Sequence, residues 1–248
     1  MGRTALLKVP EDLPQFCGAL GIPLIEVPNW YAAFRRTVAR KAAPVEEPME
    51  AQETSLMSNH LTDSSCTHLA SGIRNNRTLR TLDLSRNNLE GPHFRDLMDA
   101  LTTSRIDHLL LMSNHLTDNS CHHLASGIGN NKTLRTLNLS GNNLEGPHFR
   151  DLMEAMTTSR IEELLLSHNH LTDSSCPHLA SGIRNIQTLR TLILSGNNLE
   201  GPHFKDLMEA LTTIQIEELQ IVNKNLSREE KRELKKLGKL RPGLKISL

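Results

Sequence analysis

The segment LRTLDLSRNNL, which runs from Leu79 to Leu89, follows the pattern L-x-x-L-x-L-x-x-N-x-L. Leu82 and Leu84 alternate with polar Thr, Asp and Ser residues, which is the periodicity of a strand that buries one face. Asn87 follows where such a strand would end, and a buried Asn amide can bond the otherwise unpaired backbone of a turn. The segment therefore predicts a short strand that leads into a turn held by a buried Asn.

The same pattern recurs along the chain and starts again at Ile106, Leu134, Ile161, Leu189 and Ile216, with spacings that alternate between 27 and 28 residues. Two successive repeats form a unit of 55 residues, and 43 of 55 positions are identical between residues 61–115 and 116–170. A fixed period of this length is typical of a solenoid, because one repeat cannot bury its own apolar face.

The second half of each repeat has helical periodicity. In one repeat type Cys66, Leu69 and Ile73 have the i, i+3, i+7 spacing of one helix face. Thr62 and Asp63 precede them and are the expected N-caps of that helix. In the other type, Phe, Leu and Met residues that follow a Pro form the inward face. Each repeat is therefore expected to be one strand and one helix.

The motif and its period resemble the leucine-rich repeat, and the two alternating repeat types are similar to its ribonuclease-inhibitor-like subclass. The resemblance covers residues 54–248, about four fifths of the chain. It implies an α/β fold, namely a right-handed horseshoe solenoid with a parallel sheet on the concave face and helices on the convex face. The Asn residues of successive repeats are expected to form a buried structural ladder: Asn87, Asn114, Asn142, Asn169 and Asn197.

Three regions are expected in the chain. Residues 1–41 hold the only Trp and Tyr and form an N-terminal segment, which either caps the first repeat or docks a second partner. Residues 42–53 are rich in Pro and Glu, which indicates an acidic flexible linker. Residues 54–248 form the repeat domain. Its first repeat is incomplete, so its open edge is expected to be covered by residues 1–41 or by another subunit of a larger assembly.

Two further features concern the ends of the chain. Ser227 and Glu230 form a capping box for a charged helix of residues 228–237 that Gly238 and Pro242 end, so a terminal cap is expected from about residue 227, with a basic binding site as the alternative. At the other end, residues 11–36 are similar to the segment ahead of the repeats in a ciliary leucine-rich-repeat subunit of the nexin–dynein regulatory complex.

Charge and hydropathy argue against several classes of protein. The 28 Lys and Arg residues balance 28 Asp and Glu residues, which argues against a general footprint for nucleic acid or an anionic membrane. No apolar run reaches the roughly 20 residues of a membrane helix, and charged residues interrupt the N-terminus where a signal peptide would be apolar. We therefore expect a cytoplasmic protein, with a cytoskeletal or ciliary location as the narrower alternative.

The sequence predicts no catalytic site, metal, cofactor or small-molecule substrate. Cys66, Cys121 and Cys176 are copies of one position and are expected to be reduced thiols, because positions two repeats apart lie too far from each other for a disulfide. The His residues also recur two repeats apart and form no tetrahedral ligand set. No phosphate-binding loop is present, and no Ser/His/Asp arrangement stands out from the repeats.

Differences between the near-identical copies indicate a binding face. Of the 12 differences between the first two units, six lie in or beside the strands, most of them at outward positions of the concave face. Variation on one exposed face favours the tuning of a binding surface, and neutral drift at solvated positions is the alternative. The partner-binding residues predicted on this face are Asp83, His108, Leu110, Met112, Asn138, Glu163, Leu165, Ile193 and Gln220.

Two rows of this face have distinct chemistry. Leu110, Leu165 and Ile193 are expected to form an exposed aliphatic strip, and a contiguous exposed apolar patch commonly marks an interface. In a second row acids and bases alternate, and opposite charges on adjacent strands support strand pairing. This charged row is Arg80, Asp107, Arg135, Glu162, Arg190 and Glu217.

The expected function is a non-catalytic protein–protein interaction module, or a scaffold subunit, that binds a macromolecular partner on its concave strand face. The alternative is a GTPase-activating protein for a small G protein, because one such family has a similar repeat architecture. Nucleotide hydrolysis assays with candidate G proteins would separate the two.

Overall fold

Strands and helices alternate along the part of the chain that the computed structural model describes, residues 52–248. The strands are β1 (Gln52–Ser55), β2 (Leu79–Asp83), β3 (His108–Leu110), β4 (Thr136–Asn138), β5 (Glu163–Leu165), β6 (Thr191–Ile193), β7 (Glu218–Gln220) and β8 (Lys245–Ser247). The helices are α3 (Ser65–Asn75), α4 (Phe94–Leu101), α5 (Asp118–Asn130), α6 (Phe149–Met156), α7 (Cys176–Asn185), α8 (Phe204–Thr213) and α9 (Arg228–Leu240), with a short 3-10 helix, η3 (Asp173–Ser175), before α7.

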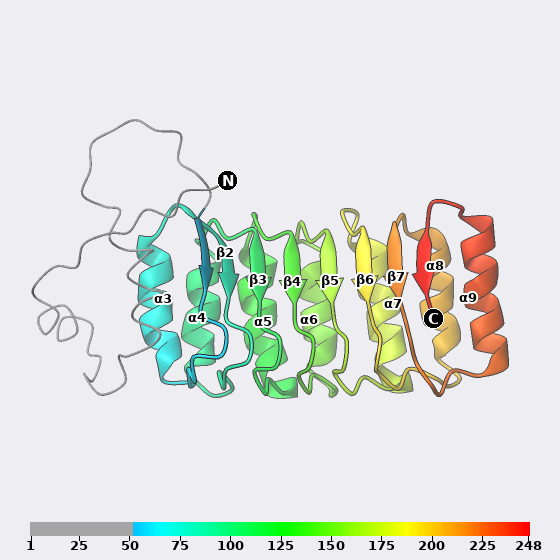
Figure 1. Cartoon of the computed structure of the whole chain (residues 1–248), viewed down its shortest axis with the longest axis horizontal. Coiled ribbons are helices and arrows are strands. Elements are labelled where there is room, and N and C mark those ends of the chain that lie inside the picture. Colours follow the sequence, from blue (N-terminus) through cyan, green and yellow to red (C-terminus); the bar gives the residue numbers. More distant parts are fainter. Residues whose placement is uncertain (1–51) are drawn as a thin grey trace, which may run out of the picture.

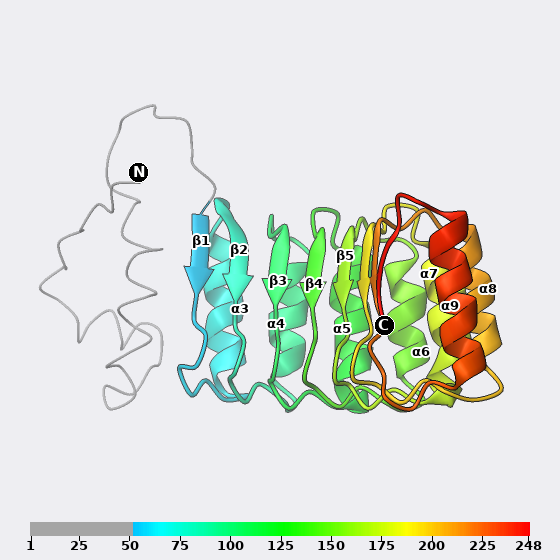
Figure 2. The same ribbon diagram turned by 45° about the vertical axis from the view of Figure 1, so that its right-hand side comes forward.

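The strands form one parallel sheet whose spatial order, from β1 to β8, equals the order in the chain. Figures 1 and 2 show the strands in one layer and the helices in a second layer that covers one face of the sheet. Parallel neighbours need a crossover connection, and the helix of each repeat supplies it. The prediction of an α/β repeat solenoid is confirmed.

The core lies between the two layers and is built from rows of aliphatic side chains. The central Leu of one strand pairs with the Leu of the next, so that Leu82 lies beside Leu109 and Leu109 beside Leu137. These three side chains are at most 2% exposed. The largest buried side chains of the helices are three equivalent residues at the starts of α4, α6 and α8: Phe94, Phe149 and Phe204.

The helices begin against acids of the preceding repeat. Asp63 does not cap α3. Its Oδ1 instead accepts a hydrogen bond from the backbone N–H of Phe94, the first residue of α4, at 3.0 Å. The expectation that Asp63 caps its own helix is therefore wrong, because the carboxylate reaches the unpaired N–H groups at the start of the neighbouring helix. Asp118 makes the equivalent contact with Phe149 of α6, and Asp173 accepts a hydrogen bond from the N–H of His203, just before α8.

Glutamates accept hydrogen bonds in the same way at the start of the helices of the other repeat type. Glu90 accepts hydrogen bonds from the backbone N–H of Thr117 at 3.2 Å and from its hydroxyl at 2.6 Å, just before α5. Glu145 does the same for Thr172, at 3.1 Å and 2.7 Å, just before η3. Together with the aspartates they join each repeat to the one that follows it.

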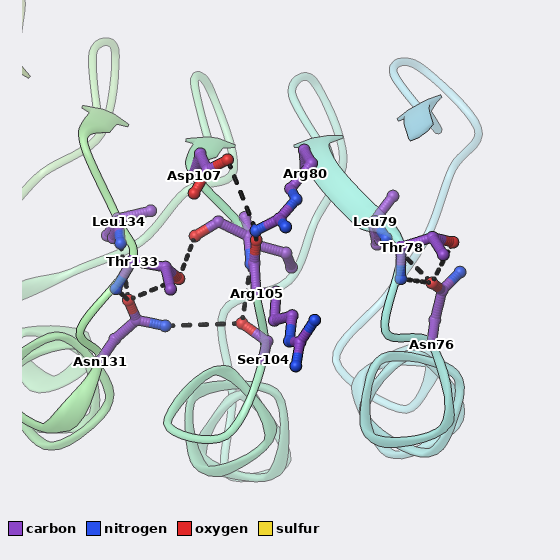
Figure 3. A network of polar contacts seen from close by, with 11 residues as sticks. Asn76, Thr78, Leu79, Arg80, Ser104, Arg105, Asp107, Asn131, Thr133 and Leu134 are labelled. Carbon is purple, nitrogen blue, oxygen red and sulfur yellow. Dashed lines mark hydrogen bonds and ion pairs between the residues drawn. The ribbon is translucent and has the colours of Figure 1, made fainter. Parts of the chain in front are cut away.

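The turn from helix to strand is held by an Asn whose structural role was not predicted. Asn131 is 1% exposed, and its Oδ1 accepts hydrogen bonds from the N–H groups of Thr133 and Leu134 at 2.8 and 2.7 Å. Its Nδ2 donates to the carbonyl oxygen of Leu101 in the preceding repeat at 2.7 Å. Asn76 holds the equivalent turn after α3, and Figure 3 shows the two turns together.

The ends of the repeat domain differ from the predicted boundaries. β1 begins at Gln52, so the repeat domain includes the last residues of the predicted linker. The capping box of Ser227 and Glu230 is confirmed, but α9 runs on to Leu240, because an exposed helix tolerates a Gly such as Gly238 at modest cost. β8 was not predicted. The predicted roles of residues 1–41, the similarity of residues 11–36 and the remainder of the linker lie outside the described residues.

Candidate protein-binding face

The outward side chains of β1 to β8 form the strand face, and the parallel register places the predicted residues side by side. Across the middle of the sheet the Cα partners are, in order, Asp83, Leu110, Asn138, Leu165, Ile193 and Gln220. In a neighbouring row, His108 and Glu163 lie on either side of Thr136. Met112 follows β3, and its carbonyl oxygen accepts a hydrogen bond from Arg86. All nine predicted residues thus lie on one face of the sheet or directly beside it.

A line of hydrogen bonds crosses three strands of this face. His108 Nδ1 lies 2.8 Å from the hydroxyl oxygen of Thr136, and that hydroxyl lies 3.1 Å from Glu163 Oε2. Thr136 is 8% exposed, whereas His108 and Glu163 are exposed. The buried hydroxyl therefore orients two exposed polar side chains that a partner can reach.

Carboxylates outnumber bases in the central rows of the strand face. Glu53, Asp83, Glu163 and Glu218 lie on four different strands, and Lys245 on β8 is the base in the same rows. The hydrogen bonds of these acids go to neutral groups. For example, Asp83 accepts from the hydroxyl of Ser55 at 3.3 Å. Within residues 52–248 none of the four is in an ion pair. The four acids and one base give these rows a net negative charge.

The aliphatic strip differs from its prediction in two ways. Leu110, Leu165 and Ile193 are half-buried rather than exposed, because neighbouring strands in the same row cover their flanks. Asn138 lies between Leu110 and Leu165, so the strip is interrupted. The large apolar residues exposed at the strand ends are Met57, at 42%, and Val222, at 47%.

The charged row forms ion pairs within each unit. Arg80 Nη1 lies 3.8 Å from Asp107 Oδ2, and Arg190 Nη1 lies 3.6 Å from Glu217 Oε1. Arg135 pairs with Glu162 in the unit between them. Exposed pairs of this kind contribute about 0–1 kcal/mol each, so the row supports the strand register more than it stabilises the fold.

The five Asn residues of the ladder are between 0% and 5% exposed, but their bonding alternates. Asn142 Oδ1 accepts hydrogen bonds from the N–H groups of Asn114 and Leu116 at 2.9 and 3.1 Å. These two residues flank His115, whose φ of 60° places both N–H groups on one side of the turn. By contrast, the Oδ1 atoms of Asn114 and Asn169 have no hydrogen-bond partner in the described part of the chain. The ladder is therefore complete only in alternate repeats.

The cysteines and the possible metal ligands were also considered as chemical groups in the sequence. Cys66, Cys121 and Cys176 are buried thiols without a disulfide. Desolvation by burial, with nearby carboxylates, raises the pKa of Cys66 and of Cys176 to about 12, which leaves them unreactive at neutral pH. Over residues 52–248 no three His, Cys, Asp or Glu side chains are grouped so as to hold a metal ion. In the same range, no helix has the length and apolar character to cross a membrane.

Sequence reasoning missed the contacts between an acid and the next helix. Asp63, Asp118 and Asp173 each lie 2.6 Å from the Nδ1 of a His one repeat further on: His93, His148 and His203. The signal was present, because both residues recur unchanged in all three units. Their pairing could not be found from spacing alone, since it joins different repeats.

Comparison with known proteins agrees with this geometry. A family model described as Leucine Rich repeat matches residues 75–92 and 130–147, and a second one, Leucine Rich Repeat, matches residues 188–209. The chain is 32% identical over 149 residues to human NACHT, LRR and PYD domains-containing protein 13, which is 59% of this chain and 14% of that protein. It is 31% identical over 173 residues to the Ribonuclease inhibitor of Sus scrofa, which is 67% of this chain and 38% of that protein.

The Ribonuclease inhibitor of Mus musculus is 27% identical over 192 residues, or 75% of this chain and 42% of that protein. The chain thus spans less than half the length of each of these relatives. A solved structure of Leiomodin-1 Actin-Binding Site 2 aligns at a TM-score of 0.36 and 13% identity, over 76% of this chain and 80% of that chain, and this likeness carries no argument. The repeat motif, the parallel sheet, the two family models and the ribonuclease inhibitor relatives together identify the chain as a leucine-rich-repeat protein of the ribonuclease-inhibitor-like type.

Proposed function

We propose that this chain is a non-catalytic protein-binding module, alone or as a scaffold subunit of a larger assembly, and that its strand face is the docking surface. The observation that carries the proposal is the row from Asp83 to Gln220, in which six side chains from neighbouring strands point the same way. The leucine-rich-repeat relatives support the coarser statement that such a repeat array binds proteins.

The chemistry of the strand face favours a partner with an apolar anchor and nearby bases. Leu110, Leu165 and Ile193 offer partly accessible aliphatic surface near the middle of the sheet. Carboxylates such as Asp83 and Glu163 lie around them without an ion pair of their own in the described residues. Apolar burial would supply most of the affinity, while complementary charge would speed association and select the partner.

Two of the relatives are named ribonuclease inhibitors, so ribonucleases are the first partners to test. We also propose a cytoplasmic location, which the three buried, unpaired thiols support, because reduced cysteines persist in that compartment.

The decisive experiment compares two triple variants of the full chain. Leu110→Glu/Leu165→Glu/Ile193→Glu places three charges on the strand face. The control, Asn75→Glu/Asn130→Glu/Asn185→Glu, places three charges at equivalent exposed positions on the helix layer. Circular dichroism and urea unfolding verify that both fold. Binding to a panel of ribonucleases is then measured by titration calorimetry.

We expect the strand-face variant to bind at least about tenfold more weakly, because buried carboxylates are costly at an interface, and the control to bind as the original chain does. Equal binding by all three proteins would mean that the strand face is not the docking surface. If no ribonuclease binds even the original chain, this choice of partner is wrong. Cross-linking of the three proteins in cell extract then tests the face itself.

A further inference from the structure

Helix α9 closes the solenoid at its C-terminal end, beyond α8 (Figure 1). Its buried side chains, Leu234 and Leu237, are 0% and 4% exposed and face the repeats. Four exposed bases lie on the opposite side of the helix, at positions i, i+4, i+7 and i+11, and form the α9 ridge: Arg228, Arg232, Lys235 and Lys239. At about 100° a residue, these four bases occupy an arc of about 60° and a length of about 16 Å.

Four other charged groups of this region make contacts within the fold. Glu230 accepts a hydrogen bond from the N–H of Ser227 at 2.7 Å, in the capping box. Glu233 pairs with Lys236. Arg241 donates to the backbone carbonyl oxygens of Leu211 and Ile216, at 3.2 and 2.8 Å. By contrast, no acid in residues 52–248 forms an ion pair with any base of the α9 ridge.

The bases of the chain are concentrated near its C-terminal end, although its total charge is balanced. The chain as a whole has a formal net charge of zero, but residues 228–245 contain eight bases and three acids. A terminal cap needs only a polar outer face to keep the array soluble, and mixed charges would meet that need. The α9 ridge instead carries one sign of charge along its full length, which indicates an anionic partner.

We propose that the α9 ridge docks the end of the solenoid on an anionic phospholipid surface. The ridge is convex, and a flat surface can meet all four of its bases at once. Glu229 and Glu233 lie about 90° and about 130° around the helix from the centre of the ridge, where they would oppose the walls of a nucleic-acid groove but stay clear of a flat surface.

The test is sedimentation of the full chain with vesicles of phosphatidylcholine, with and without phosphatidylserine. We expect binding only when phosphatidylserine is present, and weaker binding at high salt, because the attraction is screened. Arg232→Glu/Lys235→Glu should lower the partition coefficient by about 30-fold or more. The control, Arg77→Glu/Arg160→Glu, makes the same charge change at exposed loop positions away from α9 and should bind as the original chain does.

Ridge variants are expected to fold, since the ridge bases have no ion pair to lose, and circular dichroism checks this. Equal loss in both double variants, or no loss in the ridge variant, would overturn the assignment to the α9 ridge. Absence of binding to any vesicle would overturn the proposal. Ridge-dependent binding of soluble polyglutamate under conditions in which vesicles do not bind would show that the partner is an acidic polypeptide instead. The strand-face variant should bind vesicles normally, because this site is separate from the proposed protein-binding face.

Discussion

Asp118 and His148 belong to successive repeats, yet the Asp118 carboxylate accepts a hydrogen bond from the backbone N–H of His148 at 2.8 Å and lies 2.6 Å from its Nδ1. The same carboxylate accepts a hydrogen bond from the N–H of Phe149 at 3.1 Å. Both N–H groups lie at the start of α6, where the helix itself offers no acceptor. The negative charge also favours the positive end of the helix dipole. Each such acid thus completes the helix of the repeat that follows.

Removal of this carboxylate should destabilise the fold. We expect Asp118→Ala to lower the free energy of unfolding by about 1–2 kcal/mol, the usual contribution of a helix N-cap. Urea unfolding at neutral pH measures the change. Asp99→Ala is the control, because the Asp99 side chain is 43% exposed and its ion pair with Arg95 should contribute less than about 0.5 kcal/mol. Equal losses in the two variants would show that Asp118 does not act as a cap.

The position of the Asp118 carboxylate also explains why residue 146 is a glycine. Gly146 has a φ of 156°, and a Cβ at this position would lie 2.3 Å from Cγ of Asp118. We expect Gly146→Ala to cost about 2–3 kcal/mol, through backbone strain and displacement of the carboxylate. Gly243→Ala should be nearly neutral, because no atom lies within 4 Å of a Cβ there. In the Asp118→Ala background the same glycine substitution should cost less, and additive costs in the double variant would refute the contact.

The alternating Asn ladder predicts unequal costs at equivalent positions. Asn142→Ala removes the acceptor of two backbone N–H groups, those of Asn114 and Leu116, and should cost about 3–4 kcal/mol. Asn169→Ala removes an amide whose Oδ1 has no partner in the described residues, and should cost about 1–2 kcal/mol. Urea unfolding of the two variants gives the comparison directly. A larger loss for Asn169→Ala would contradict the bonding pattern.

His93 predicts a dependence on pH. Its hydrogen bond to Asp63, and the charge of that carboxylate, raise the pKa of His93 above its ordinary value of 6.5. The pKa of His93 is thus higher in the folded protein than in the unfolded chain. The stabilisation of the fold by the His93–Asp63 contact is therefore complete below about pH 6.5, and it is lost as the pH rises through the pKa of the folded protein. NMR titration of the His93 ring should show the raised pKa, and Asp63→Asn should lower it. Identical titration curves in the two proteins would exclude Asp63 as the cause.

Features that depend on one repeat could be predicted from the sequence, and features that join two repeats largely could not. The alternation of Leu82 and Leu84 with polar residues is local, so it predicts the strand and its buried face. Nearby sequence does not determine which helix the Asp63 carboxylate contacts, because its own helix and the next one both offer N–H groups. Only the packing distance between repeats decides between them. The strand-face rows followed from the repeat spacing, whereas the half-buried state of Leu110 depends on the side chains of both adjacent strands.

The contacts between an acid and the next helix all run in one direction. Asp63 serves α4, Glu90 the start of α5, Asp118 α6 and Asp173 α8, so the acceptor always precedes its helix in the chain. During synthesis the acceptor leaves the ribosome first, so α4, α5, α6 and α8 each emerge after the acid that serves them. Loss of repeats from the C-terminal end leaves every remaining helix with its acceptor. Loss of one repeat from the N-terminal end instead leaves the first remaining helix without its acceptor, so we expect the array to tolerate truncation less well at that end.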